Sequence, residues 1–123
     1  IVFPNTPLST TESFIRGNRD TALRFMRGFT QGLNRLRNDK DFSMKVLSKY
    51  TKVTDTETLA QLHHTYGVRY SGDRIPYVRT EGVAEILKRM PGKEAREAKA
   101  GEFVDNSLLK DLEQSGWFKK LGD

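Results

Sequence analysis

Hydrophobic positions between residues 18 and 36 recur with the period of an α-helix. Six apolar residues lie three or four positions apart and line one side: Ala22, Phe25, Met26, Phe29, Leu33 and Leu36. This spacing predicts an amphipathic helix of about five turns with one buried side. Asn18 can cap its start, and Asp20 complements the positive end of the helix dipole.

Two shorter helices are predicted in the centre of the chain. Asp39 or Asp41 can cap the first, whose apolar positions are Phe42, Val46, Leu47 and Tyr50. The second begins at Thr54, because Thr54 and Glu57 have the spacing of a capping box. Its apolar side comprises Leu59, Leu62, His63, Tyr66 and Tyr70.

The C-terminal third predicts two more helices joined by a polar linker. One begins at Thr80 and ends before Pro91 and Gly92, with an inner face of Val83, Ile86, Leu87 and Met90. Residues 93–101 favour helix but lack an apolar stripe, so we interpret them as a solvated, partly helical linker. The last helix is capped by Asp105, buries Leu108, Leu109 and Leu112, and ends at a left-handed Gly116 that places Trp117 for a hydrophobic contact.

The N-terminal residues have a different pattern. Pro4, Asn5 and Pro7 punctuate a stretch of β-branched and aromatic residues, which predicts a turn and then a strand over residues 8–15. The fold class expected for this chain is therefore mainly α, with one N-terminal strand and about five amphipathic helices. A single strand needs a sheet, and this chain supplies no other strand, so we expect a portion of the fold to be missing.

Two glycines, Gly28 and Gly32, lie one turn apart in the longest predicted helix. Each weakens a helix by about 1 kcal/mol relative to alanine. Either another backbone approaches the helix at this point, or neither glycine touches anything; the sequence does not separate these two interpretations.

Composition limits the function classes. The 123 residues suffice for one domain, and 36% hydrophobic residues make a lean core. The net charge of +5 comes from interspersed charges of both signs, which gives only weak support to a nucleic-acid partner. The absence of cysteine excludes disulfides and cysteine-based zinc sites from this stretch. The first residue is Ile1 rather than Met, which suggests a chain entered midway.

No catalytic or metal constellation is predicted. His63 and His64 are adjacent, so on a helix they point about 100° apart and cannot chelate one ion. Ser9 and its neighbouring threonines lack the G-x-S-x-G elbow of a serine nucleophile. Three arginines on one side of the long helix form either a solvated face or an anion-binding stripe: Arg24, Arg27 and Arg35. We therefore expect no enzyme, with a small basic helical DNA-binding or regulatory module as an alternative.

Five short motifs occur in the order found in one known family. The first two are T-x-x-F-I at Thr11, Phe14 and Ile15 and, after a polar break, R-F-x-R in a long helix at residues 24–27. The others are K-V-L-S-K-Y-T at 45–51, I-P-Y-V-R-T-E-G at 75–82 and the closing F-V-D-x-S with S-G-W-F at 103–118. Where the family has a serine cap this chain has Arg79, so we expect Thr80 to cap. The chain resembles the C-terminal portion of the nitrate/sulfonate/taurine-type substrate-binding proteins of bacterial ABC importers.

The resemblance implies a two-lobed α/β fold of the periplasmic-binding-protein type II class. Residues 1–123 would be a single segment, the C-terminal part of the first lobe, in a solute-binding component without cofactor. The implied partners are a small anionic or polar solute and a membrane permease, not nucleic acid; self-association through exposed apolar surface stays open. The implied location is periplasmic, or extracellular with a lipid anchor. The positions expected nearest the solute are Asn5, Thr6 and Ser9.

The same family includes thiamine pyrimidine-precursor synthases, which are enzymes that use a cysteine-rich motif early in their chains. This segment contains no cysteine. It neither supports nor excludes that enzymatic branch, which therefore remains a further alternative.

Overall fold

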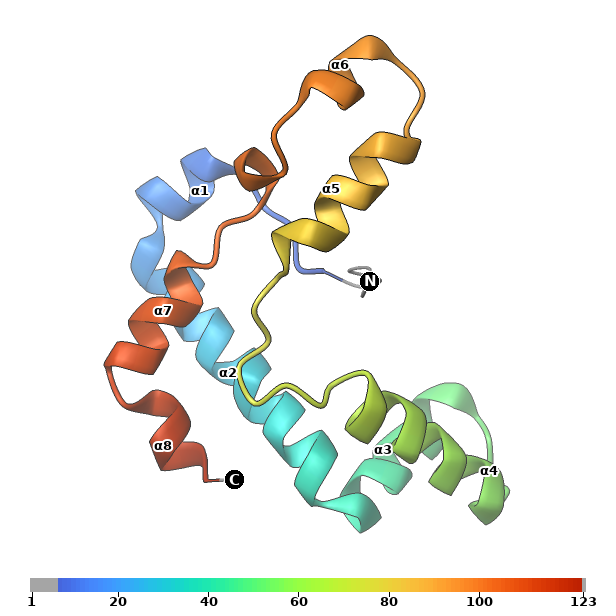
Figure 1. Ribbon diagram of the computed structural model, residues 1–123. Helices are drawn as coiled ribbons and strands as arrows, with labels where there is room; N and C mark the ends of the chain where they lie inside the picture. Colours follow the sequence, from blue (N-terminus) through green and yellow to red (C-terminus); the bar gives the residue numbers. More distant parts are fainter. Residues whose placement is uncertain (1–6, 123) are drawn as a thin grey trace.

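The computed structural model describes residues 7–122, and helices make up most of them (Figure 1). The part of the chain so described contains no strand. The elements, in chain order, are α1 (Glu12–Gly17), α2 (Arg19–Asn38), α3 (Lys40–Thr51), α4 (Thr56–Leu62), the π-helix η1 (His63–Arg69), α5 (Thr80–Arg89), α6 (Lys93–Glu97), the 3-10 turn η2 (Ala100–Phe103), α7 (Ser107–Gln114) and α8 (Trp117–Leu121).

The long helix α2 is the element around which the others are arranged. It contacts α1, α3, η1, α7 and α8, and α7 and α8 lie along it while α3 and α4 gather near its C-terminal end (Figure 1). Asn18 occupies the N-cap position as expected, although its side chain makes no capping hydrogen bond. Asp39 ends α2 and caps α3, where its carboxylate accepts a hydrogen bond from the Phe42 amide at 3.1 Å. The predicted long helix is confirmed.

The strand predicted over residues 8–15 is wrong. Residues 7–11 are irregular, and α1 begins at Glu12. The reason is a local cap: Oγ1 of Thr11 accepts a hydrogen bond from the Phe14 amide at 3.1 Å, and Glu12 lies in the first turn. An N-cap threonine followed by an acidic residue favours a helix start, and this outweighs the β-propensity of the threonines.

The capping box predicted at Thr54 is also wrong, because Asp55 caps α4. The Asp55 carboxylate accepts hydrogen bonds from the Thr58 amide at 2.8 Å and from the Thr58 hydroxyl at 2.7 Å. These two bonds, the hydroxyl first, lower the pKa of Asp55 because they favour its charged form. The helix itself forms where the pattern placed it.

After Leu62 the helix widens into the π-helix η1, which the periodicity did not predict. A π-helix adds a residue to the turn, and side chains beyond it leave the face that a 3.6-residue period gives them. Tyr66 and Tyr70 are consequently exposed and contact each other, with ring centroids 5.8 Å apart. His63 is buried, and its Nε2 lies 2.8 Å from the Leu36 carbonyl oxygen. The histidine thus packs against α2, whereas the two tyrosines do not.

The helix predicted from Thr80 is confirmed as α5, and Arg79 rather than Thr80 occupies its N-cap position without a side-chain bond. The linker over residues 93–101 is partly helical, as expected, and contains α6. Figure 1 shows α5 and α6 projecting from the rest of the chain as a hairpin.

The predicted last helix is α7. Asn106 rather than Asp105 holds the N-cap position, while the Asp105 carboxylate accepts a hydrogen bond from the Ser107 amide at 2.8 Å. Gly116, which was predicted to end this helix in a left-handed conformation, has a φ of 77°. The chain then forms one more short helix, α8, which the pattern missed.

The core is small and lies where α7 and α8 meet α2. Leu109, Leu112 and Phe118 are its buried residues, and partly buried side chains surround them: Leu23, Met26, Ile75, Tyr77, Trp117 and Leu121. At its edge, the Arg19 guanidinium on α2 donates to the Asp111 carboxylate on α7 at 2.5 Å. The terminal helices are therefore fixed to α2 by both apolar and polar contacts.

Candidate functional site

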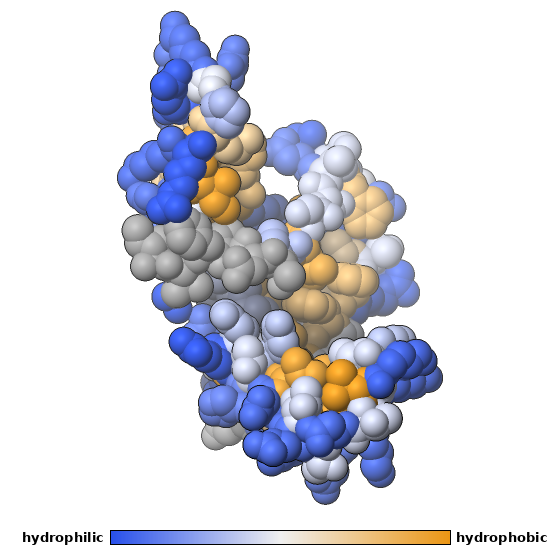
Figure 2. All heavy atoms as spheres, turned by 90° about the vertical axis from the view of Figure 1, so that its right-hand side faces the viewer, coloured by the Kyte–Doolittle hydropathy of each residue, from blue (hydrophilic) through white to orange (hydrophobic). Residues whose placement is uncertain are grey.

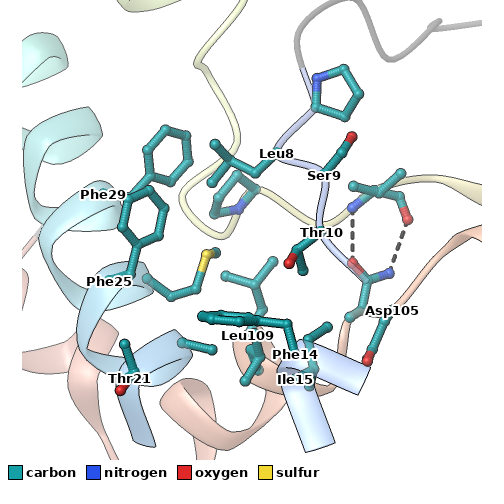
Figure 3. Close-up of a pocket in the computed structure, with 17 residues that line it drawn as sticks. Leu8, Ser9, Thr10, Phe14, Ile15, Thr21, Phe25, Phe29, Asp105 and Leu109 are labelled. Atoms are coloured by element: carbon teal, nitrogen blue, oxygen red, sulfur yellow. Dashed lines mark hydrogen bonds between the residues drawn. The ribbon is translucent and has the colours of Figure 1, made fainter. Parts of the chain in front are cut away.

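A cavity of about 440 Å³ lies between the N-terminal segment, α1, the first half of α2, and the start of α7 (Figure 3). Its lining is mainly apolar: Pro7, Leu8, Phe14, Ile15, Ala22, Phe25, Met26, Phe29, Pro76, Val78, Leu108 and Leu109. The polar lining residues are Ser9, Thr10, Thr21, Asp105 and Asn106. No histidine, lysine or arginine is among these lining residues.

Aromatic side chains form one wall of the cavity. The Phe25 and Phe29 rings stack with their centroids 6.5 Å apart and 8° between their planes, and Phe14 of α1 faces them (Figure 3). This wall is open to solvent, since Phe25 is 59% exposed, Leu8 48% and Phe14 40%. The described residues therefore leave the large apolar side chains of this wall uncovered.

The side chain of Asn106, on the opposite side of the cavity, is already engaged in hydrogen bonds. The Asn106 amide group donates to the Val78 carbonyl at 2.9 Å, and its oxygen accepts from the Val78 amide at 3.0 Å (Figure 3). This pair of bonds ties the loop before α5 to the start of α7. The Asn106 side chain therefore holds the cavity wall in place.

Asp105 gives this side of the cavity a negative charge. Hydrogen bonds from Ser107, first from its hydroxyl and then from its backbone amide, lower the pKa of Asp105. The carboxylate is thus ionised at neutral pH. An anion placed in the cavity would be repelled by it, while an uncharged apolar group would meet the aromatic wall.

The structure places only one of the three predicted solute-contacting residues. Ser9 lies in the segment that borders the cavity (Figure 3) and is exposed. Asn5 and Thr6 lie outside the described residues. The sequence pattern missed the contributions of Val78, Asp105 and Asn106, because these residues approach the N-terminal segment only through the fold.

Two of the arginines considered for an anion-binding stripe have ion-pair partners. In α2, Arg24 pairs with Asp20 at 3.2 Å and Arg35 with Asp39 at 3.4 Å. The Arg35 guanidinium also lies 3.4 Å from the centroid of the Phe42 ring. Two of the three arginines in the proposed basic stripe are thus partly neutralised, which weakens the case for an anion-binding face.

Within residues 7–122, no group of three or more histidine, aspartate or glutamate side chains is arranged to hold a metal ion. The helices of that range include none that is long and apolar enough to cross a membrane.

Comparison with protein-family models, with curated proteins and with solved structures found no match to this chain.

Proposed function

We propose that this chain is part of the solute-binding component of an ABC importer related to the nitrate/sulfonate/taurine type. In this proposal it is a non-enzymatic segment of a two-lobed α/β protein, and the lobes close on a small anionic or polar solute. The proposal is supported by the order of the five sequence motifs and by one structural observation, which is the open apolar cavity beside α2.

The cavity matters because the described chain does not bury its own large apolar side chains. Among residues 7–122, six apolar residues are buried, whereas eleven large ones are more than one-third exposed, including Phe25 and Phe103. A layer of helices that lies against a larger lobe would have this distribution, and a self-contained helical bundle would not.

The strand that first suggested a missing sheet is absent from residues 8–15, so it gives the proposal no support. The exposed apolar surface replaces it as the structural argument. It requires a covering partner but does not by itself specify a transporter; the family assignment rests on the resemblance.

The proposed function is tested by measuring solute binding to the protein with all the residues that its gene encodes. Nitrate, taurine and a short alkanesulfonate would be titrated calorimetrically, with sodium chloride as the matched control. We expect saturable binding of one of them, and stabilisation of about 2.7 kcal/mol when the ligand is present at one hundred times its Kd. No binding across the panel at millimolar concentration contradicts the proposal.

The DNA-binding alternative is tested with random duplex DNA at increasing salt. Phosphate contacts would give an affinity that falls steeply with salt concentration. We expect no such binding, since Arg24 and Arg35 are engaged in ion pairs with their own helix or its end.

A further inference from the structure

We propose that residues 79–105 form an arm that moves as a rigid unit about its base and acts as a lid on the apolar cavity. The arm comprises α5, α6 and η2, and its base is the pair of hydrogen bonds between Val78 and Asn106. We call residues 7–77 and 107–122 the body. A lid of this kind would serve any occupant of the cavity, so it does not depend on the proposed function.

The helices of the arm pack on one another but not on the helices of the body. α5 contacts η2 and α6. Within residues 7–122, no Cα atom of these three elements lies within 8 Å of a Cα atom in α1, α2, α3, α4, η1, α7 or α8. Figure 1 shows the arm projecting from the body as a hairpin, and the space-filling view shows it as a separate upper part of the molecule (Figure 2). The helix packing that normally fixes the angle between two parts of a fold is therefore missing between the arm and the body.

Contacts inside the arm hold it together as one unit. Gly82 of α5 is buried, and Val83 and Leu87 are half-buried, although the described helices around α5 are only α6 and η2. In the returning chain, the Glu102 amide donates a hydrogen bond to the Lys99 carbonyl at 2.9 Å. The arm can therefore change its angle without losing its internal contacts.

The two ends of the arm are joined at its base. The Asn106 side chain accepts from the Val78 amide at 3.0 Å and donates to the Val78 carbonyl at 2.9 Å. Just inside this clamp, Arg79 leads into α5 and Val104 leads out of η2, and both have extended backbones. Hinges lie at such loop and helix-terminal residues, because their φ and ψ angles can change without breaking a helix. The clamp thus fixes the position of the pivot and leaves the angle of the arm free.

An ion pair also joins the arm to the body. The Arg79 guanidinium lies 3.1 Å from the Asp73 carboxylate, and both side chains are more than half exposed. An ion pair this exposed contributes little to stability. It therefore does not fix the angle of the arm.

The base of the arm is also part of the cavity wall. Val78, Asp105 and Asn106 line the cavity, so rotation about the base moves the chain that borders it (Figure 3). The arm carries exposed apolar side chains of its own, among them Met90 and Phe103. An arm that turns toward the exposed aromatic wall would bring apolar surface against apolar surface and remove both from water, which favours closure.

Distances between pairs of spin labels, measured by double electron–electron resonance on introduced cysteines, test the lid, since residues 1–123 contain no cysteine. The host is the protein with all the residues that its gene encodes, with any other cysteine changed to serine. The pair Glu94→Cys and Thr21→Cys measures the arm against the cavity wall. Two control pairs share these positions: Glu94→Cys with Glu81→Cys lies within the arm, and Thr21→Cys with Lys45→Cys lies within the body. All four native side chains are exposed.

We expect the pair between arm and wall to give a distance distribution about twice as wide as either control pair, or wider, because hinge motion samples several arm angles. A distribution as narrow as those of the controls overturns the lid. A pair within the arm that is as broad as the pair between arm and wall also overturns it, because the arm would then not move as a unit. Should Thr21→Cys disturb the start of α2, Lys110→Cys on α7 replaces it in both pairs.

A second measurement tests the pivot. Asn106→Ala removes both bonds of the clamp, and Gln114→Ala, at an exposed position of α7, is the matched control. We expect Asn106→Ala to broaden the distribution between arm and wall further, and Gln114→Ala to leave it unchanged. A distribution that Asn106→Ala does not alter would overturn the assignment of the pivot to the bonds between Val78 and Asn106.

Discussion

The indole Nε1 of Trp117 donates a hydrogen bond to Oγ1 of Thr30, 3.0 Å away, across 87 residues of sequence. Thr30 is buried in the middle of α2, and its own hydroxyl hydrogen is directed to the Met26 carbonyl at 2.8 Å. One threonine therefore joins the last helix of the chain to the longest one. The contact fixes the first residue of α8 against the middle of α2.

Replacing Thr30 with valine should test this contact. The change keeps the shape of the side chain but removes the acceptor, so the indole N–H loses its partner. We expect the free energy of unfolding to fall by about 1–3 kcal/mol. Trp117 is the only tryptophan of the sequence, so its emission should also shift to longer wavelength as the indole becomes more solvated.

The matched control for Thr30→Val is a double-mutant cycle with Trp117→Phe. If the hydrogen bond matters, the two losses should be less than additive by about 0.5 kcal/mol or more. Strictly additive effects would show that Thr30 stabilises α2 without help from Trp117.

A second prediction concerns the two hydrogen bonds between Asn106 and the backbone of Val78. Asn106→Ala removes both, and it leaves the Val78 amide and carbonyl to find other partners. We expect a loss of about 1–3 kcal/mol and faster hydrogen exchange at the Val78 amide. Gln114→Ala, at an exposed position of α7, is the control and should change little. If hydrogen exchange at the Val78 amide did not change, the two bonds to Asn106 would not be holding these segments together.

A third prediction contrasts three helical glycines. At Gly28 and Gly32 a Cβ meets no atom within 4 Å, so alanine at each should stabilise the folded chain by about 1 kcal/mol. At Gly67 a Cβ would lie 3.1 Å from the Leu36 carbonyl oxygen and 3.2 Å from Cδ2 of His63. Gly67→Ala should destabilise by about 1–3 kcal/mol, because the crowding involves backbone.

Urea unfolding of the three variants checks this contrast. Equal effects at Gly28 and Gly67 would contradict it, since helix propensity alone would then decide.

A fourth prediction is a pH dependence from Tyr77. Its hydroxyl donates to the Glu113 carboxylate at 2.6 Å, and this bond, followed by burial and the negative charge, raises the pKa of Tyr77 to about 12. The neutral phenol is favoured in the folded state. The hydrogen bond between Tyr77 and Glu113 therefore stabilises the folded state fully below the unfolded pKa of tyrosine, about 10. This stabilisation is lost as the pH rises toward 12.

Ultraviolet titration of tyrosinate absorbance, with Tyr77→Phe subtracted, isolates this group. Glu113→Gln should bring the pKa of Tyr77 back toward its ordinary value of about 10, because the negative acceptor is gone. A Tyr77 that titrates near its ordinary pKa in the unmodified protein would show that the bond to Glu113 is not maintained in solution.

Several features of the helices could be predicted from local sequence patterns. The apolar stripe of α2, the cap at Asp39 and the left-handed Gly116 were all predictable, because each depends on residues within a turn or two of one another. The prediction from the sequence was wrong where two local signals competed. The threonines before Phe14 favour a strand by propensity, yet the hydrogen bond from the Phe14 amide to Thr11 starts a helix.

The π-helix shows a second kind of limit. Tyr66 was expected on the apolar side by counting 3.6 residues per turn, and one widened turn moved it into solvent. The widening brings Gly67 against the carbonyl of Leu36, a residue of a different helix, so the signal for it was not local.

The sequence by itself determined the helices α2, α3, α4, α5 and α7 and the lean composition of the core, because periodicity and capping are properties of neighbouring residues. The tertiary structure alone decided that Asn106 meets Val78, that Trp117 meets Thr30, and that residues from both ends of the chain enclose one open apolar cavity. Such contacts depend on how helices pack in space, and no spacing along the chain encodes them.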